Sequence, residues 1–278
     1  MMGGKDWRYY NHALLPQCAP HEKADITLIE NDAIWGLATE GAVLFARWTS
    51  DFDCPDPTEW WWCIADKPLD LSKLKAKRRY EHKKAAKNFV VKKIEPINYI
   101  DELRDVRMKA FSAYPSKYRP NIEAKEQLIE KFSDNSFAIY AAFYDGKIAG
   151  YVSVKDNGSH LLYNEQKTNP SLEKYGVNLA LVDAVLQVYA ERLNGDFYIV
   201  DGERSVNHQT NFQDYLIKYA GFRRVYCRLN IKVNPQYRYL INIAYRFRWL
   251  LCKFDFVGII HKINAVLKMY SIARNSSI

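Results

Sequence analysis

Hydrophobic and polar positions follow a new pattern from residue 89 onward. Short apolar runs bounded by turn residues alternate there with longer stretches in which apolar residues recur every three or four positions. The short runs predict strands, and the longer spacing predicts amphipathic helices. The predicted order is β-α-α-β-β-β-α-β-α-β. Its strands are expected at residues 89–94, 137–144, 147–154, 160–165, 197–200 and 223–231, and its helices at 99–113, 122–132, 177–193 and 207–220.

The first 88 residues carry a weaker pattern. Residues 1–30 are predicted to be irregular, because Pro16 and Pro20 interrupt them. The next two apolar runs flank a turn at Glu40 and Gly41, which predicts a hairpin. The expected elements are two strands of that hairpin, a buried strand and a helix, at residues 33–39, 42–49, 60–63 and 71–87.

Together these elements predict an α/β protein with a mixed central sheet flanked by helices. We expect a β-rich N-terminal segment, a basic connecting helix, a larger α/β domain and a basic, aromatic helical tail, at residues 1–70, 71–88, 89–232 and 233–278. Of the 278 residues, 48% are hydrophobic and 26% are charged. This composition is typical of globular proteins and excludes a mainly disordered or fibrous chain.

Positive charge is concentrated in two places. The formal net charge is +8, and residues 231–278 hold eight Lys and Arg against one acid, Asp255, so they carry seven of these charges. A second basic run, at 73–87, has eight cations against Glu81. Concentrated positive charge attracts partners that carry phosphate. The run at 73–87 is therefore expected either to bind tRNA or lipid phosphate or to be a solvated connector.

The cations of the tail alternate with large apolar side chains. The aromatic residues among them are Tyr237, Tyr239, Tyr245, Phe247, Trp249, Phe254 and Phe256. A helical segment with this mixture suits peripheral binding to an anionic membrane surface or to a lipid-linked acceptor. The alternative is a pair of helices packed on the domain or on a partner subunit, which leaves an oligomer open.

Several classes of site are not expected. The five Cys are odd in number and form no CxxC pair, which argues against a disulfide framework or a zinc site. His12, Cys18 and His21 lack a fourth ligand, so no metal is expected. The chain has no apolar run typical of a signal peptide and none long enough to span a membrane. We therefore expect a cytoplasmic protein, and its tail adds the expectation of peripheral binding at the inner membrane face.

Three segments carry a resemblance to a known family. IYAAFYDGKIAGYVSV (139–154) looks like the central hairpin of the GNAT acyltransferase superfamily, and NFQDYLIKYAGFRRVYCRLNI (211–231) looks like its final helix and strand. LSKLKAKRRYEHKKAAKNFVVKKIE (71–95) resembles the basic helix that leads into the second GNAT unit of Fem-like peptidyltransferases. The resemblance covers residues 71–232 and implies a GNAT-like sheet. The N-terminal segment would correspond to a truncated first unit.

The resemblance also implies where a donor binds. GNAT enzymes carry [Arg/Gln]-x-x-Gly-x-[Gly/Ala] at the start of the long helix, where backbone N–H groups approach a pyrophosphate. The cofactor-binding residues expected from this alignment are Lys174, Gly176, Val177 and Asn178. Only the glycine fits the signature, and Glu173 at its first position would repel a phosphate. The leaving-group tyrosine of many GNAT enzymes is replaced by Ile217, between Tyr215 and Tyr219. The donor is therefore expected to be acyl-CoA or, as in Fem-like relatives, an aminoacyl-tRNA.

Acyl transfer to an amine needs a base near the acceptor. Glu165 stands at the end of the strand before the long helix, where GNAT enzymes often place a base and where splayed strands open the cleft; it is otherwise a surface carboxylate. Asp201 and His208 follow the buried strand at 197–200 and are candidates to take a proton. The alternative for this segment is a turn and helix cap, with Asn207 as the cap.

Substrate contacts are expected in two loops. The loop between the first two helices lines the acceptor site in GNAT enzymes, and its tyrosines and cations suit a sugar or phosphate ligand. It is otherwise a plain surface loop. The arginine after the buried strand at 197–200 is suited to hold a carboxylate or phosphate. The expected substrate-binding residues are Tyr114, Lys117, Tyr118, Arg119, Tyr163, Glu203 and Arg204.

The expected function is transfer of an acyl or aminoacyl group to an amine on a cell-envelope or polysaccharide precursor. The amine would attack the bound ester or thioester directly, because no nucleophile of the chain has an evident activating partner. One alternative is a conventional acetyl-CoA-dependent N-acetyltransferase acting on a soluble amine. Another is a GNAT-like module without catalysis that binds membrane or RNA through its basic tail.

Overall fold

The chain forms two compact units in the computed structural model, which describes residues 6–36, 41–115, 119–206 and 211–276. Unit 1 consists of residues 1–62, 203–210 and 224–278, and unit 2 of residues 63–202 and 211–223. Three strands contain a boundary between the units: β4 (Trp60–Ala65), β9 (Tyr198–Glu203) and β10 (Arg223–Val233).

Unit 2 is built on a mixed sheet in the order β9-β8-β7-β6-β5. Its other strands are β5 (Val90–Ile94), β6 (Phe137–Tyr144), β7 (Lys147–Asp156) and β8 (His160–Thr168). Neighbours from β5 to β8 are antiparallel, whereas β8 and β9 are parallel. A tight turn at Asp145 and Gly146 joins β6 to β7, and both residues have positive φ, as a two-residue hairpin turn requires.

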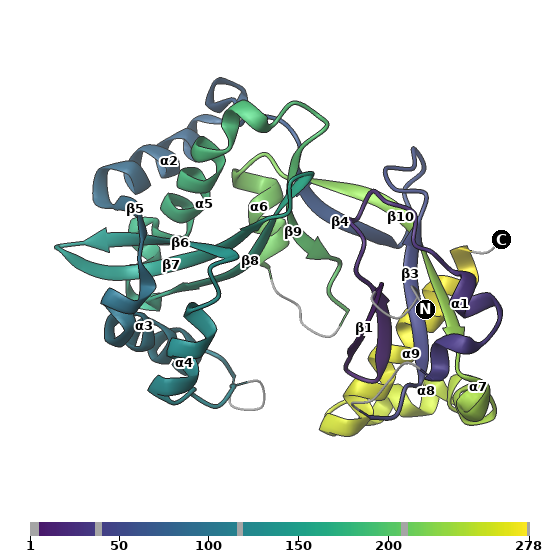
Figure 1. The fold of residues 1–278 in the computed structure, drawn as a ribbon. Coiled ribbons are helices and arrows are strands. Elements are labelled where there is room, and N and C mark those ends of the chain that lie inside the picture. The colour runs from purple at the N-terminus through teal and green to yellow at the C-terminus, as the bar shows by residue number, and fades with distance from the viewer. Residues whose placement is uncertain (1–5, 37–40, 116–118, 207–210, 277–278) are drawn as a thin grey trace. The chain divides into compact units, whose positions relative to one another are not determined.

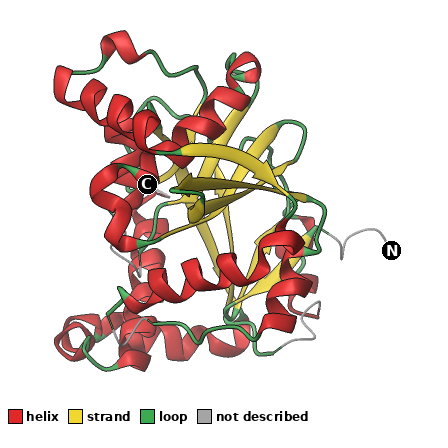
Figure 2. Cartoon of the chain, turned by 90° about the vertical axis from the view of Figure 1, so that its left-hand side faces the viewer, coloured by secondary structure: helices red, strands yellow, loops and turns green. Residues whose placement is uncertain are grey.

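Helices cover both faces of this sheet (Figure 1). On one face lie α3 (Ile100–Ser112) and α4 (Lys125–Phe132), and on the other α2 (Ala76–Asn88), α5 (Val177–Val188) and α6 (Phe212–Tyr219). In Figure 2, where unit 2 faces the viewer, its strands lie between these two sets of helices. Leu103 and Val106 of α3 recur at helical spacing and pack on Ile139 and Tyr151 of the sheet.

Unit 1 contains a second group of strands. β1 (Trp7–Tyr10) and β2 (Ala13–Pro16) form an antiparallel pair, β2 lies parallel to β3 (Phe45–Ser50), and β3 pairs antiparallel with β10. The helices of this unit are α1 (Thr27–Glu30), α7 (Arg238–Arg246), α8 (Arg248–Leu251) and α9 (Gly258–Ser276).

Short 3-10 segments complete the described chain. They are η1 (Ala33–Gly36), η2 (Leu71–Lys73), η3 (Pro96–Tyr99), η5 (Pro170–Tyr175), η6 (Ala190–Arg192), η7 (Pro235–Tyr237) and η8 (Cys252–Phe254). The α/β class and the element order from residue 89 are confirmed, with shifted boundaries. Helix 71–87 begins only at Ala76, and helix 177–193 ends at Val188.

The prediction of a hairpin across residues 33–49 is wrong. Residues 33–36 form η1, where Asn31 accepts a hydrogen bond from the Ala33 amide at 3.0 Å and Asp32 accepts one from the Trp35 indole at 2.9 Å. These local bonds and the complete burial of Ile34 favour the turn over a strand. Residues 37–40 of the predicted hairpin lie outside the described residues.

The prediction that residues 1–30 are irregular is also wrong. β1 and β2 form a hairpin whose turn is Asn11-His12, with φ of 47° and 65°. Asn and His enter this left-handed region more readily than most residues, so a turn forms without glycine. Trp7 and Leu14 of the hairpin are buried in one apolar cluster, which stabilises it.

Within the described part of the chain, none of the helices combines the length and apolar character that crossing a bilayer requires.

Candidate functional site

The parallel strands β8 and β9 separate near the middle of β8. Their paired residues are His160 with Tyr198, Leu161 with Ile199 and Leu162 with Val200. β8 continues to Thr168 on the other side of this point and remains paired with β7 along that length. The first residues past the last β8–β9 pair are Tyr163 and Asp201. The sequence analysis expected splayed strands beside the long helix at 177–193. The pairing of β8 with β9, which stops after Leu162 and Val200, agrees with this expectation.

A β-bulge lies at the same point of β8. Ser153 of β7 faces Glu165, but its neighbour Val154 faces Tyr163, so Asn164 is the additional residue. A bulge re-aims side chains and is common beside active sites. Here the Tyr163 ring lies 6.2 Å from the Phe212 ring of α6, whereas Glu165 bonds to Arg107 of α3. Adjacent parts of β8 thus supply polar groups to both faces of the sheet.

Asp201 is the carboxylate at the point of separation. It is half-buried, and the side chain of Gln213 in α6 donates a hydrogen bond to its carboxylate. Burial raises the pKa of Asp201 from its ordinary 3.8 to about 6, against the smaller opposite effect of that hydrogen bond. A carboxylate with this pKa is mostly ionised at neutral pH and accepts a proton more readily than an ordinary aspartate.

Tyr163 lies beside this carboxylate and keeps its proton. Burial, followed by the charge of Asp201, raises the pKa of the Tyr163 phenol well above 10. The hydroxyl donates to the side-chain carbonyl of Gln166, whose amide nitrogen donates to Oδ1 of Asn178 at 2.7 Å. Thr168 donates to the same Asn178 oxygen at 3.2 Å. This chain of bonds ties the end of β8 to the first turn of α5.

A buried histidine holds α2 against the same side of the sheet. His82 Nδ1 lies 2.7 Å from Oδ2 of Asp183 in α5, and its Nε2 lies 2.9 Å from the carbonyl oxygen of Tyr219 in α6. A carbonyl only accepts, so Nε2 carries a proton. Burial opposes the charge of His82, but Asp183 outweighs it and the histidine pKa is raised. We call Tyr163, Asp201, Gln213, Asp183 and His82 the α5-side cluster.

The predicted cofactor-binding residues lie where η5 meets α5. Gly176 has φ of 97°, and a Cβ there would lie 3.1 Å from the Cβ of Ala85 in α2. The glycine is thus needed for close contact between two helices. Lys174 is exposed, with its Nζ 5.0 Å from the centre of the Tyr175 ring, and Val177 is buried. Binding of a donor pyrophosphate by these residues and Asn178 stays a prediction.

Glu165 lies on the opposite face in a dense ion-pair cluster. Its Oε1 accepts from Arg107 at 2.5 Å, Tyr151 at 2.9 Å and Lys131 at 3.1 Å. Burial raises the pKa of Glu165, but the cations Arg107, Lys131 and Lys167 outweigh it, so the pKa falls below its ordinary value. A carboxylate that holds this many donors is a weak proton acceptor.

Arg107 is the centre of that cluster. It is 3% exposed and also binds both oxygens of Glu123, with a distance of 3.3 Å from its Nε to Oε2. We call Arg107, Glu123, Tyr151, Lys131 and Glu165 the α3-side cluster.

The predicted substrate-binding residues lie on different elements of the chain. Tyr114 is exposed at the end of α3, and its hydroxyl lies 3.4 Å from Nζ of Lys167. Arg119 donates to the carbonyl oxygens of Ser112 at 2.8 Å and Tyr114 at 3.2 Å, so it caps the end of α3. The remaining predicted residues of these loops, Lys117, Tyr118 and His208, lie outside the described residues.

Glu203 and Arg204 belong to unit 1, whereas Asp201 belongs to unit 2. Glu203 forms an ion pair with Arg47, and the guanidinium of Arg204 donates to the backbone carbonyl of Glu59. Both side chains therefore have partners inside their own unit.

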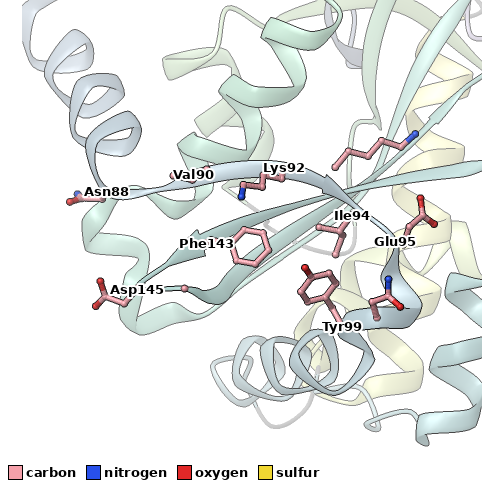
Figure 3. A pocket seen from close by; sticks show the side chains of 11 residues that line it. Asn88, Val90, Lys92, Ile94, Glu95, Tyr99, Phe143 and Asp145 are labelled. Atoms are coloured by element: carbon pink, nitrogen blue, oxygen red, sulfur yellow. The ribbon is translucent and has the colours of Figure 1, made fainter.

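Two hollows in the described part of unit 2 are lined by no predicted site residue, although the second is lined by Lys131, the ion-pair partner of Glu165. One, of about 650 Å³, follows the outer strand β5 and is lined by Val90, Lys92, Tyr99 and Phe143 (Figure 3). The other, of about 390 Å³, lies beside the bulged Asn164. In the described chain, no group of His, Cys, Asp and Glu is arranged to hold a metal ion.

Sequence reasoning missed Gln213, Gln166, Asp183 and His82. Helical spacing puts Gln213 on the face of α6 that also carries Leu216, and its burial could have been read from that pattern. Nothing in the sequence places His82 beside Asp183, because the two residues are 101 positions apart.

No family model matches the chain, and neither does any curated protein. Among solved structures, L-PGS from Bacillus licheniformis aligns over 86% of this chain and 83% of its own, with 10% identity and a TM-score of 0.50. The C-terminal domain of a putative lysylphosphatidylglycerol synthetase from Agrobacterium fabrum aligns over 82% and 79%, with 12% identity and a TM-score of 0.49. An aminoglycoside acetyltransferase from an uncultured soil metagenomic sample aligns over 49% and 86%, with 15% identity and a TM-score of 0.35.

At these identities the likeness is one of fold. The chain has an α/β fold with the mixed sheet and flanking helices that the sequence predicted, and it shares this fold with the L-PGS structure. Membership of the Fem-like branch stays a prediction.

Proposed function

We propose that the protein transfers an acyl group from an ester or thioester donor to an amine, at the point where β8 and β9 part. The observation that carries this proposal is the position of Asp201, the first residue of β9 beyond the last pair with β8. Its raised pKa, of about 6, suits a general base at neutral pH. The GNAT-like fold supports the same class of reaction.

The chemistry needs no covalent enzyme intermediate. The amine nitrogen attacks the donor carbonyl carbon, and its N–H becomes acidic as the N–C bond forms. Asp201 takes that proton, and the donor's C–S or C–O bond breaks with its electron pair on the leaving sulfur or oxygen. The chain supplies orientation and a proton acceptor, and positioning alone contributes a large part of the rate in such reactions.

Surrounding residues prepare Asp201 for this role. Gln213 fixes the carboxylate by a hydrogen bond, and neither its amide nor the neutral phenol of Tyr163 beside the carboxylate carries a positive charge. Glu165 is the less suitable base, because Arg107 and Lys131 already hold its oxygens.

The donor and acceptor are proposed at the level of class. Acyl-CoA is the first donor to test and aminoacyl-tRNA the second. As acceptor we propose an amine on a cell-envelope or polysaccharide precursor. An amine on a lipid headgroup is the second candidate, because the basic, aromatic tail suits binding to an anionic membrane surface or to a lipid-linked acceptor.

The first experiment measures transfer and its dependence on Asp201. The full chain is assayed with acetyl-CoA and, separately, alanyl-tRNA, each against glucosamine and spermidine as amine probes. We expect transfer from one donor and a fall in kcat of about 10²- to 10⁴-fold in Asp201→Asn. The matched control is Asp196→Asn, an exposed carboxylate just before β9, which is expected to leave kcat unchanged.

Two results would overturn this assignment. If Asp201→Asn kept kcat within threefold of the unchanged protein, Asp201 would not be the base. If calorimetry found no binding of either donor by the folded chain, a module without catalysis would be favoured over both acyltransferase alternatives.

A further inference from the structure

The segment from Arg238 to Ile263 exposes a concentration of large apolar side chains. Of the nineteen large hydrophobic residues that are exposed in the described chain, eleven lie between Tyr239 and Ile263. Phe256 is 77% exposed, Tyr239 76% and Ile259 69%. Exposed apolar patches of this kind on a folded protein mark interaction sites. We call the exposed side chains of residues 238–263 the tail surface.

The tail surface belongs to a segment that is folded onto unit 1. Ile272 and Ala273, near the end of α9, are buried with Trp60, Cys227 and Leu229. Lys268 lies in the same part of α9, and its Nζ is 3.2 Å from a carboxylate oxygen of Glu59. α7 and α8 lie alongside α9 (Figure 1).

A second set of contacts joins these helices to one another. Tyr245 of α7 packs edge-on against Tyr270 of α9 with ring centres 5.2 Å apart, and Asn264 donates to the carbonyl oxygen of Leu251 at 3.2 Å. The apolar side chains are therefore exposed on helices that pack against one another and on the rest of unit 1, and not on an unfolded segment.

The tail surface is strongly basic. Its exposed cations are Arg238, Arg246, Arg248, Lys253 and Lys262. Its one acid, Asp255, already accepts from His261 at 2.8 Å and from Asn264 at 2.7 Å. Nζ of Lys253 lies 5.2 Å from the Trp249 ring, so a cation and an aromatic ring stand together at the surface. Such pairs suit the headgroup level of a bilayer, where the ring is partly buried and the charge stays hydrated.

We propose that the tail surface docks the protein on an anionic lipid bilayer, with its apolar side chains inserted at the level of the headgroups. The aliphatic residues decide against RNA as the occupant: Leu240, Ile243 and Ile259 offer neither a stacking plane nor a hydrogen bond to a base. The charge decides against a second copy, because two surfaces with the same excess of cations repel each other. An anionic leaflet meets both requirements.

This inference goes beyond the proposed acyl transfer and does not depend on it. The Asp201→Asn variant should bind vesicles as well as the unchanged protein does. Failure of one proposal is thus distinguishable from failure of the other.

The test is co-sedimentation of the full chain with vesicles of phosphatidylcholine, with and without 30% phosphatidylglycerol. We expect binding to the anionic vesicles that weakens between 0.1 and 0.5 M NaCl, because salt screens surface charge. Each cation near an anionic leaflet contributes roughly a fivefold change in binding. The triple variant Arg246→Gln, Arg248→Gln, Lys253→Gln should therefore bind at least about tenfold more weakly, and so should Trp249→Ser combined with Phe256→Ser.

Matched controls remove the same chemistry elsewhere. Lys77→Gln, Lys83→Gln and Lys87→Gln remove three exposed cations from α2, and Tyr80→Ser with Val188→Ser removes two exposed apolar side chains. Both control variants should keep vesicle binding within about twofold. Brominated phosphatidylglycerol should quench tryptophan fluorescence in the unchanged protein, and Trp249→Phe should lose most of that quenching.

Any of three results would overturn the proposal. The first is binding to anionic vesicles that the α2 triple variant weakens as much as the tail triple variant does. The second is no vesicle binding by the folded chain. The third is a different occupant of the tail surface. Either of two observations would show this: tighter binding to poly-uridine RNA than to anionic vesicles, or concentration-dependent dimerisation in light scattering that is lost in the Trp249→Ser and Phe256→Ser variant.

Discussion

The two faces of the unit 2 sheet hold buried polar clusters of opposite character. In the α3-side cluster, Glu165 accepts from Arg107 and Lys131, and its pKa falls below the ordinary value. In the α5-side cluster, Asp201 has the neutral amide of Gln213 as hydrogen-bond donor, and its pKa rises to about 6. Both carboxylates lie just past the point where β8 and β9 part. Burial acts on both, and the presence of cations decides the direction of the shift.

The difference indicates different roles for the two faces. A buried ion-pair network whose members satisfy one another orders the helices around it, and α3 and β8 are joined in this way. A half-buried carboxylate such as Asp201, whose hydrogen-bond partner Gln213 is a neutral amide, costs stability, and such groups are concentrated at functional sites. The following predictions test this contrast, beginning with the largest expected effect.

Arg107→Met should be strongly destabilising. It removes the shared cation of Glu123 and Glu165 and leaves two carboxylates in a partly buried site. Removing one partner of a buried ion pair costs about 3–5 kcal/mol. Urea denaturation at pH 7.5 measures the effect, with Lys109→Met, an exposed cation on the same helix, as the control expected to change stability by less than about 0.5 kcal/mol.

Acid should partly rescue Arg107→Met. Without Arg107, the pKa of Glu165 rises, so acidic pH protonates this carboxylate and removes a charge that Arg107 no longer balances. A loss below about 1 kcal/mol at pH 7.5 would contradict a structural role for this cluster.

Asp201→Asn should stabilise the fold at neutral pH while it removes activity. The folded-state pKa of about 6 exceeds the ordinary 3.8, so the folded protein binds more protons than the unfolded chain between these values. Stability of the unchanged protein therefore falls as pH rises from about 4 to 6, and the asparagine variant avoids this loss. At pH 7.5 the variant should be more stable by on the order of 1–3 kcal/mol.

The pH dependence is the decisive part of that measurement. The difference between Asp201→Asn and the unchanged protein should vanish below about pH 3, where the carboxyl is protonated in both the folded and the unfolded state. A variant less stable than the unchanged protein at pH 7.5 would show that the carboxylate is compensated by a group other than Gln213.

Gly176→Ala should lower the free energy of unfolding by less than Arg107→Met does. Gly158→Ala is the reference variant for this change. Both glycines have positive φ, of 97° and 83°, which costs an alanine about 1–2 kcal/mol. Only at Gly176 would the new Cβ meet a neighbour, Ala85 of α2 at 3.1 Å, whereas Gly158 has open space. The excess loss at Gly176 in thermal unfolding measures how closely α2 must pack on the α5-side cluster. Equal losses would mean that α2 moves away without cost.

The sequence is informative where a feature is local. The strands and helices from residue 89 follow from apolar spacing and turn residues, and Asp201 stands out because it follows a buried strand. Pairing between distant segments is a different matter. β3 has β10 as partner, with Ser50 and Asn230 bonded across 180 positions, and no local pattern shows this.

The same limit applies inside the site. The sequence identifies Glu165 as a candidate base, but Arg107, 58 positions away, makes it a poor one. The environment of a titratable group depends on tertiary contacts, so its pKa could not be read from its position in a strand.

Glu165→Gln should have the smallest effect on kcat, and it distinguishes the roles of Glu165 and Asp201 most directly. Glutamine keeps a carbonyl oxygen that accepts from Arg107 and Tyr151, and Arg107 keeps Glu123 as its charged partner. We expect kcat to change by less than about threefold, against about 10²- to 10⁴-fold for Asp201→Asn. The two variants are compared in one transfer assay at pH 7.5, with the kcat profile from pH 5 to 9. In the unchanged protein and in Glu165→Gln, kcat should fall below about pH 6, where Asp201 takes up a proton. If Glu165→Gln removed activity and this acidic limb while Asp201→Asn kept both, the roles of the two faces would be reversed.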